Sequence, residues 1–387
     1  MRDNVLFEIT KDHLDTGLRG IPVGYCTTSF VDPIQGLSYV GIPIGEIAHR
    51  EPTELIYLLY YGEMGSKEEI AKFQGQLNER AHLKAETIAA IERLPQAGHA
   101  MDSFSAALLI AGMFEKTEDY EKDCLGVIAK LPEIAARVIN HHAGWGPSPT
   151  SKPDLGYIEN FVEMLNQPVE KTPELLNAMK LFNTIHYDHS GGNLSAFVGK
   201  AVASGLEHMY GSLAAAMAAL AGPRHGRANQ DCLEFVQKVL HRLGAHAQPK
   251  DVEQWIREML AKHEVLAGFG HAVLRVEDAR ATVCYEYAQK YFPNHPLVKM
   301  ALLLRTEGSK VLKENPKISD PYPNIDAITG SMLTAAGFPF SDYYTVLFGL
   351  SRCVGIAIQI VYERCEARGG KGTPIVRPKY LYKPREI

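Results

Sequence analysis

Apolar residues recur at helical spacing along most of the chain, and strand-like patterns are confined to its first part. Short apolar runs separated by Gly, Pro and Asp predict small hairpins or extended arms at 6–9, 21–30 and 37–42. From Pro52 onward the apolar spacing is typical of amphipathic helices. We expect helices at 85–93, 103–116, 119–140, 231–243, 251–263, 276–291, 296–313 and 343–366. No repeat period is present, so the pattern predicts an all-α fold with little sheet.

Two predicted helices begin with explicit capping signals. Ser66-Lys-Glu-Glu69 has the form of a capping box, and apolar residues follow it at helical spacing. Thr172-Pro-Glu174 places a capping hydroxyl, a first-turn proline and a carboxylate near the positive helix end. By contrast, 141–153 begins with two histidines and is rich in Gly, Pro and Ser, so we expect a loop there.

The predicted helix 343–366, which we expect Ser341 and Asp342 to cap, is apolar nearly all round. A helix without a polar face is normally buried. Arg352 lies in its middle, and a buried arginine is costly unless an anion accompanies it. We expect a structural Asp or Glu as that partner, with a bound anion as the alternative. The small residues of 195–221 predict helices that approach one another closely, inside a bundle or at a subunit interface.

Composition narrows the class of protein without defining its function. The chain has 387 residues, with 46% hydrophobic and 22% charged, and a net charge of -5, which disfavours a general nucleic-acid or membrane-surface binder. We find no apolar run of membrane-spanning length. The six cysteines are scattered, as in a reducing compartment. Without a recognisable leader we expect a cytoplasmic protein, or the mitochondrial matrix if a leader has been removed.

The stretch 268–280 combines a tight glycine turn, a histidine and two arginines. Gly268 and Gly270 allow the backbone to bend sharply and approach a ligand. The stretch is not a dinucleotide-binding fingerprint, because Val273 stands where the third glycine would be. Nor is 369–373 a phosphate loop, since Gly372 follows its lysine. Two interpretations of 268–280 stay open at this point: a functional site, or a loop that enters a helix with its arginines on the solvated face.

Titratable side chains gather at the breaks between predicted helices, next to Gly or Pro. They are His186, His189, His225, His271 and Asp326, with Arg224, Arg227, Arg275 and Arg280 nearby. Side chains on loops held by a rigid scaffold are often functional, and such a pocket suits a small polyanion. A metal site at 186–189 is disfavoured, because no cysteine or second carboxylate motif joins it. Each histidine taken singly suits a structural role; the group of five makes that interpretation weaker.

Six ordered segments resemble the citrate synthase family over nearly the whole chain. They are 185–193, 221–230, 268–280, 323–327, 343–352 and 377–379, and they are closest to members with Gly-Tyr-Gly-His-Ala-Val-Leu-Arg. The resemblance implies an all-α homodimer with a large helical domain at 1–226 and 338–387. A smaller inserted helical domain at 227–337 would close over the active site.

The resemblance also implies a reaction, in which oxaloacetate, acetyl-CoA and water give citrate and CoA. It assigns catalytic roles to His225, His271 and Asp326: Asp326 as the base, His225 at the thioester oxygen and His271 at the oxaloacetate ketone. The residues that would hold oxaloacetate are His189, Arg280, Arg352 and, from the partner subunit, Arg377. The residues that would line the CoA site are Val265, Leu266, Gly268, Gly270 and Asn324. No metal or cofactor is implied beyond the CoA carried by the substrate.

The chain departs from the family pattern at several positions. Val40, Ala100 and Ala279 replace Arg, Pro and Pro, and a Gly/Lys insertion precedes Arg377. None of these removes an implied catalytic group. Two alternatives remain open: a 2-methylcitrate synthase that uses propionyl-CoA, and a catalytically silent binding protein. The joint presence of the three catalytic groups argues against the second.

Overall fold

The computed structural model describes residues 5–385, and 58% of it is helical with 3% strand, which confirms the all-α prediction. The sheet is small and antiparallel, in the order β1 (Ser29–Asp32), β2 (Gly36–Tyr39), β3 (Ile42–Pro43). Of the two predicted alternatives, hairpins or extended arms, no hairpin forms at 6–9 or across most of 21–30. Residues 6–9 are irregular and exposed, and only the last two residues of 21–30 belong to β1. Strand propensity there finds no neighbouring strand with which to pair.

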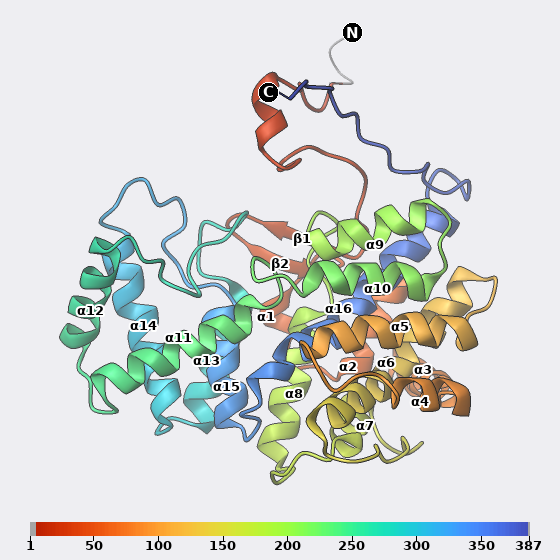
Figure 1. Cartoon of the computed structure of the whole chain (residues 1–387), viewed down its shortest axis with the longest axis horizontal. Helices are drawn as coiled ribbons and strands as arrows, with labels where there is room; N and C mark the ends of the chain where they lie inside the picture. The colour runs from red at the N-terminus through yellow and green to blue at the C-terminus, as the bar shows by residue number, and fades with distance from the viewer. Residues whose placement is uncertain (1–4, 386–387) are drawn as a thin grey trace.

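The long helix α16 (Tyr344–Val361) forms the centre of the fold, and all of its residues are buried. Around it pack α6 (Tyr120–Ala143), α8 (Pro173–His186), α9 (Leu194–Ser204) and α10 (Met209–Leu220) (Figure 1). The outer helices of this part are α1 (Ile44–Ile47), α2 (Pro52–Tyr61), α3 (Lys67–Arg80), α4 (Ala85–Ile91), α5 (Ala100–Glu115) and α7 (Tyr157–Met164).

The segment Ser341–Glu366 is long and apolar enough to cross a membrane by length and composition, contrary to our expectation from the sequence. Its apolar window is wholly buried inside the protein, so it serves as the core helix. It is also not one continuous α-helix: a 3-10 turn (Ser341–Tyr343) precedes α16, and a π-helical turn (Tyr362–Glu366) follows it. The predicted cap is absent, because no side chain caps either the turn or α16.

Five helices pack against one another at one side of the molecule (Figure 1). They are α11 (Ala228–Leu243), α12 (Pro249–Ala261), α13 (Ala279–Tyr291), α14 (Pro296–Leu312) and α15 (Asp326–Ala335). They meet the remainder through α1 with α13, α8 with α15, and α11 with α16. The division into domains at 227–337 stays a prediction, and residues 1–4 and 386–387 of the predicted large domain lie outside the described residues.

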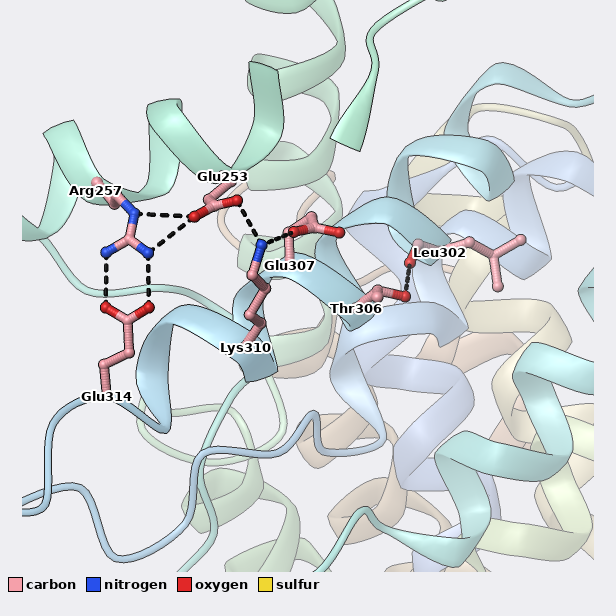
Figure 2. Close-up of polar contacts among 7 residues, drawn as sticks. All are labelled: Glu253, Arg257, Leu302, Thr306, Glu307, Lys310 and Glu314. Carbon is pink, nitrogen blue, oxygen red and sulfur yellow. Dashed lines mark hydrogen bonds and ion pairs between the residues drawn. The ribbon is translucent and has the colours of Figure 1, made fainter. Parts of the chain in front are cut away.

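An ion-pair cluster joins α12 to α14 and to the turn after it (Figure 2). Arg257 binds Glu314 with both terminal nitrogens, at 2.7 and 2.6 Å, and also reaches Glu253 at 2.8 Å. Lys310 binds the other oxygen of Glu253 at 2.6 Å and lies 3.5 Å from Glu307. Arg257, Lys310 and Glu314 are solvent-exposed, whereas Glu253 is partly buried and Glu307 is buried. Because each pair has at least one exposed member, we expect the cluster to add little stability.

The starts of α3 and α8 follow the capping signals of the sequence. Ser66 Oγ accepts the Glu69 amide at 3.3 Å, and the Glu69 carboxylate accepts the Ser66 amide at 2.8 Å, which confirms the capping box of α3. Thr172 Oγ1 accepts the Leu175 amide at 3.1 Å and caps α8. The prediction of a loop from residue 141 was wrong at its start, because α6 continues to Ala143.

Candidate active site

Asn324 fastens the glycine turn to the start of α15. Its amide nitrogen donates to Gly270 O at 3.0 Å, and its backbone N–H donates to Gly268 O at 2.9 Å. Its side-chain oxygen accepts the Asp326 N–H at 3.0 Å. One side chain therefore places the glycine turn next to the first residue of α15, which is Asp326.

Gly268 allows this close approach. Its φ is +78°, in the left-handed region that favours glycine, and a Cβ here would lie 2.8 Å from both Ala327 Cα and Cys232 Sγ. Val265 and Leu266 precede Gly268 in the chain and were both predicted to line a CoA site. They differ in solvent exposure, since Leu266 is buried and Val265 is 83% exposed. Val265 is thus accessible to a ligand at the surface, whereas Leu266 packs in the core.

The carboxyl group of Asp326 has an unusual acidity. Burial raises its pKa to about 7, the Arg280 charge opposes that rise, and the Asp278 charge adds to it. A carboxyl group with a pKa near 7 is a far stronger base than an ordinary aspartate and is still partly ionised at neutral pH. Asp326 can therefore take up a proton from a weak carbon acid if the resulting anion is stabilised.

The hydrogen bonds of His271 determine which ring nitrogen carries the proton. Its Nδ1 lies 3.0 Å from the backbone nitrogens of Val273 and Leu274. Because a backbone N–H only donates, Nδ1 must accept, and the proton resides on Nε2. Burial, with the Arg280 charge, lowers the pKa of His271 to about 4. The ring is therefore neutral at physiological pH, with an N–H at Nε2 to donate.

His225 is held in a similar way from α9. The Ser195 N–H lies 3.3 Å from His225 Nε2, and the Ser195 hydroxyl lies 2.9 Å from the same atom. Nε2 accepts the backbone donor, so the proton resides on Nδ1. Burial, with the Arg352 charge, lowers the pKa of His225 to about 4. The site thus contains a second neutral imidazole donor.

Arg280 is buried and paired with an acid that the sequence analysis missed. Its Nε and Nη2 donate to the two oxygens of Asp278 at 3.0 and 2.7 Å, and Asp278 also caps α13. Burial disfavours the Asp278 carboxylate, but Arg280 outweighs burial and holds its pKa below the usual value. The signal in the sequence was an Asp two residues before the arginine, at the start of α13. Helix α13 therefore begins at Ala279, three residues after the predicted start at 276.

Arg352 has a different environment. Its Nε donates to the His186 carbonyl at 3.0 Å and its guanidinium lies 4.8 Å from the centre of the Phe348 ring. Among residues 5–385 no carboxylate lies within ion-pair distance, so the expected structural Asp or Glu partner was wrong. Burial lowers the pKa of Arg352 to about 10, and the nearby Asp188 opposes that shift. The bound-anion alternative therefore remains.

His189 lies between these groups. Its ring centre is 5.3 Å from that of His271, and its Nε2 is buried with no hydrogen-bond partner in the described part of the chain. Burial and the charges of Arg280 and Arg352 lower its pKa well below the usual value. The charge of Arg280 also acts on the pKa values of His271 and Asp326, so both groups lie close enough to Arg280 to interact with it electrostatically.

Three other side chains that the sequence analysis singled out either bond to nearby backbone carbonyls or are exposed to solvent. His186 is buried, and its Nδ1 donates to Phe182 O at 2.7 Å within α8. Arg275 turns onto the carbonyls of its own loop, with Nη1 2.6 Å from Leu274 O. Arg377 is exposed on the irregular tail, which Val376 N fastens to Ser204 Oγ at 2.9 Å. No group of three potential metal ligands occurs within 5–385.

Known proteins resemble this chain over nearly its whole length. The family described as citrate synthase, C-terminal domain, matches residues 17–379. The chain is 35% identical to citrate synthase 4, mitochondrial, of Arabidopsis thaliana, over 97% of this chain and 82% of that protein. It is 32% identical to a mitochondrial 2-methylcitrate synthase of Yarrowia lipolytica, over 97% and 85%. A Thermoplasma acidophilum citrate synthase, solved with carboxymethyl coenzyme A and oxaloacetate, superposes with a TM-score of 0.82 at 26% identity, covering 96% of each chain.

Proposed function

The chain belongs to the citrate synthase family, and on that premise we propose that it condenses acetyl-CoA with oxaloacetate and hydrolyses citryl-CoA to citrate and CoA. It is accordingly an acyl-transferring enzyme. The observation that carries the proposal is a base with a pKa near 7 together with two neutral imidazole donors and two buried arginines. Arg280 acts on the pKa values of Asp326 and His271, and Arg352 acts on that of His225. A base, two hydrogen-bond donors and two cations are the groups needed to condense a weak carbon acid, such as a thioester methyl, with a ketone that carries two carboxylates.

The first step is removal of a methyl proton from acetyl-CoA. Asp326 takes the proton, and the electron pair of the C–H bond moves into the thioester, where charge develops on oxygen. The Nδ1–H of His225 donates to that oxygen. An aspartate alone is too weak a base for a thioester methyl, so the step needs base and donor to act together in a site closed to water.

The second step forms the carbon–carbon bond. The enol carbon attacks the oxaloacetate ketone, and the ketone oxygen takes the proton of His271 Nε2 as the bond forms. Asp326 then gives up the methyl proton and His271 regains one, so both groups return to their starting protonation states. Arg280, Arg352 and His189 hold the oxaloacetate, which converts the encounter into an oriented one. Water then attacks the thioester carbon of citryl-CoA, and CoA leaves as the thiol. We place CoA against Val265, Gly268, Gly270 and Asn324, whereas Leu266, which the family resemblance adds to this set, is buried in the core. This scheme needs no cofactor other than the CoA of the substrate.

The assembly we propose is a homodimer in which Arg377 serves the partner's site. The exposure of Arg377 on the tail supports this proposal, since the described residues of its own chain do not enclose it. The relatives described as mitochondrial support the mitochondrial matrix as the location, with the cytoplasm as the alternative. We propose neither nucleic acid nor a membrane as a partner.

The test is release of free thiol when the protein is mixed with oxaloacetate and either acetyl-CoA or propionyl-CoA. Fast release with acetyl-CoA that requires oxaloacetate is the expected result. Preference for propionyl-CoA would instead favour 2-methylcitrate synthase, the activity named for one relative. No release with either acyl-CoA, from folded protein, would make a silent binding protein the better hypothesis.

A further inference from the structure

The segment that ends in His189 lies along one face of α16. Three donors of the helix contact three successive residues of that segment. They are Arg352 Nε to His186 O at 3.0 Å, Gly355 N to Tyr187 O at 3.2 Å, and Gln359 Nε2 to Asp188 Oδ1 at 2.7 Å. Positions three and four apart share a helix face, so these donors form a row. The first donor of the row is itself a proposed ligand of oxaloacetate.

Gly355 brings the segment onto the helix backbone. A Cβ at this position would lie 2.4 Å from Tyr187 O and 2.8 Å from both Asp188 Cβ and Cγ. No side chain fits between the helix and the segment there. The position of residues 187 and 188 is therefore fixed by direct contact with α16.

The Asp188 carboxylate passes this constraint on to His189. Asp188 is fully buried, and its Oδ1 accepts both the Gln359 amide and the His189 N–H, the latter at 2.9 Å. Its other oxygen accepts the hydroxyl of Thr28. A buried carboxylate needs such donors, because it has lost those of water. One oxygen atom thus joins the backbone of His189 to the helix that carries Arg352.

The turn after His189 depends on this support. Ser190 has a φ of +65°, in the left-handed region that residues other than glycine rarely adopt. Its N–H is held by Ser29 Oγ at 2.7 Å. A turn of this kind persists when its surroundings hold it, so loosening one anchor would let the His189 ring shift.

We propose that Gln359 is a positioning residue, which clamps Asp188 to α16 and so sets the spacing between His189 and Arg352. This inference rests on the proposed function, in which both residues hold oxaloacetate. The amide has a structural cost, because Gln359 Oε1 is buried with no partner within residues 5–385. An apolar side chain would fill the space without that cost, so the donated hydrogen bond is what the amide adds.

The test compares Gln359→Leu with Gln167→Leu in the full chain. Gln167 is also buried, and neither atom of its amide has a partner in the described part of the chain, so it controls for placing leucine in the core. We expect Gln359→Leu to raise the KM and the calorimetric Kd for oxaloacetate about tenfold, because a substrate ligand is displaced. The KM for acetyl-CoA and the midpoint of the pH profile should not change. Gln167→Leu should alter none of these.

An unchanged oxaloacetate Kd in folded Gln359→Leu would overturn the positioning role, and so would equal rises in both KM values. If the leucine variant does not fold, Gln359→Asn keeps an amide but withdraws it by one methylene, and the same selective rise is expected. If the unmodified protein turns over and neither variant shows the rise, the positioning role fails while the proposed function stands. If it neither turns over nor binds oxaloacetate, both fail.

Discussion

Side chains of the site differ from their free forms mainly because they are buried. Asp326 becomes a base with a pKa of about 7, and His225 and His271 become neutral donors with pKa values of about 4. Desolvation drives all three shifts, since it disfavours whichever form is charged. The backbone donors at His271 and His225 then select the nitrogen that keeps the proton. Protonation states that suit enolisation thus follow from packing.

Replacing Asp326 with Asn should remove the base and leave the fold intact. The amide has nearly the same shape and cannot take up the methyl proton, so we expect kcat to fall by roughly 10²–10⁴-fold. Thiol release measures the loss, and circular dichroism checks the fold. Turnover close to that of the unmodified protein would show that another group is the base.

The pH dependence should show one acidic limb from Asp326. We expect kcat/KM for acetyl-CoA to rise with pH through about 7 as the carboxyl group ionises, with no second limb from the histidines above about pH 5. Loss of thioester absorbance measures the rate independently of thiol reagents. A flat profile between pH 5 and 8 would be incompatible with a base of this pKa.

The raised pKa of Asp326 also predicts how the stability of the fold depends on pH. The folded-state pKa of Asp326 lies above its ordinary value of 3.8, so its contribution to stability is full below that value and is lost as pH rises through about 7. Asp326→Asn, which cannot ionise, should therefore raise the Tm more at pH 8 than at pH 5. Thermal unfolding at both values provides the check, and an equal Tm difference at the two would contradict the raised pKa.

Helices and turns set the distances between these side chains. The glycine turn and α15 are joined through Asn324, while the row of donors on α16 holds the segment before His189. Arg280 is held by Asp278 at the first turn of α13. The groups therefore come from different elements, and each is fixed by contacts to a neighbouring element.

Gly268→Ala tests the contact between the glycine turn and α15. The new Cβ would meet Ala327 and Cys232 at 2.8 Å with φ at +78°, so the turn must move away from α15. We expect a loss of about 1–3 kcal/mol in the free energy of unfolding and a higher KM for acetyl-CoA. Denaturant unfolding and steady-state kinetics measure the two effects. Gly17→Ala is the control, because Gly17 also has a positive φ but no heavy atom near its Cβ; a similar KM rise there would indicate a general effect.

The whole molecule is built around the buried helix α16, which carries Arg352 of the candidate site. Helix α16 has the composition of a membrane span and lies in the core, surrounded by α6, α8 and α10. The helices α11–α15 contribute the glycine turn, Arg280 and Asp326, whereas His189, His225 and Arg352 come from outside them. Any movement of α11–α15 against the remainder would therefore open or close the site, as the predicted domain closure requires.

A mixing experiment tests whether Arg377 acts in the partner's site. Asp326→Asn and Arg377→Ala should each be nearly inactive alone, whereas co-refolded mixtures should regain about a quarter of the activity, because half of the dimers are mixed and each has one complete site. Thiol release measures the recovery. No recovery in mixtures shown to contain mixed dimers would place Arg377 outside the partner's site.

Local sequence signals determined the helical class, the capped starts of α3 and α8 and the motif residues of the site. Those signals are short-range, because capping and helical periodicity depend on residues a few positions apart. The fold alone decided that Asp278 pairs with Arg280, that Arg352 lacks an ion-pair partner among residues 5–385, and that Gln359 reaches Asp188. It also decided that 6–9 forms no strand. These outcomes depend on burial and on contacts between distant segments, and no local pattern contains that information.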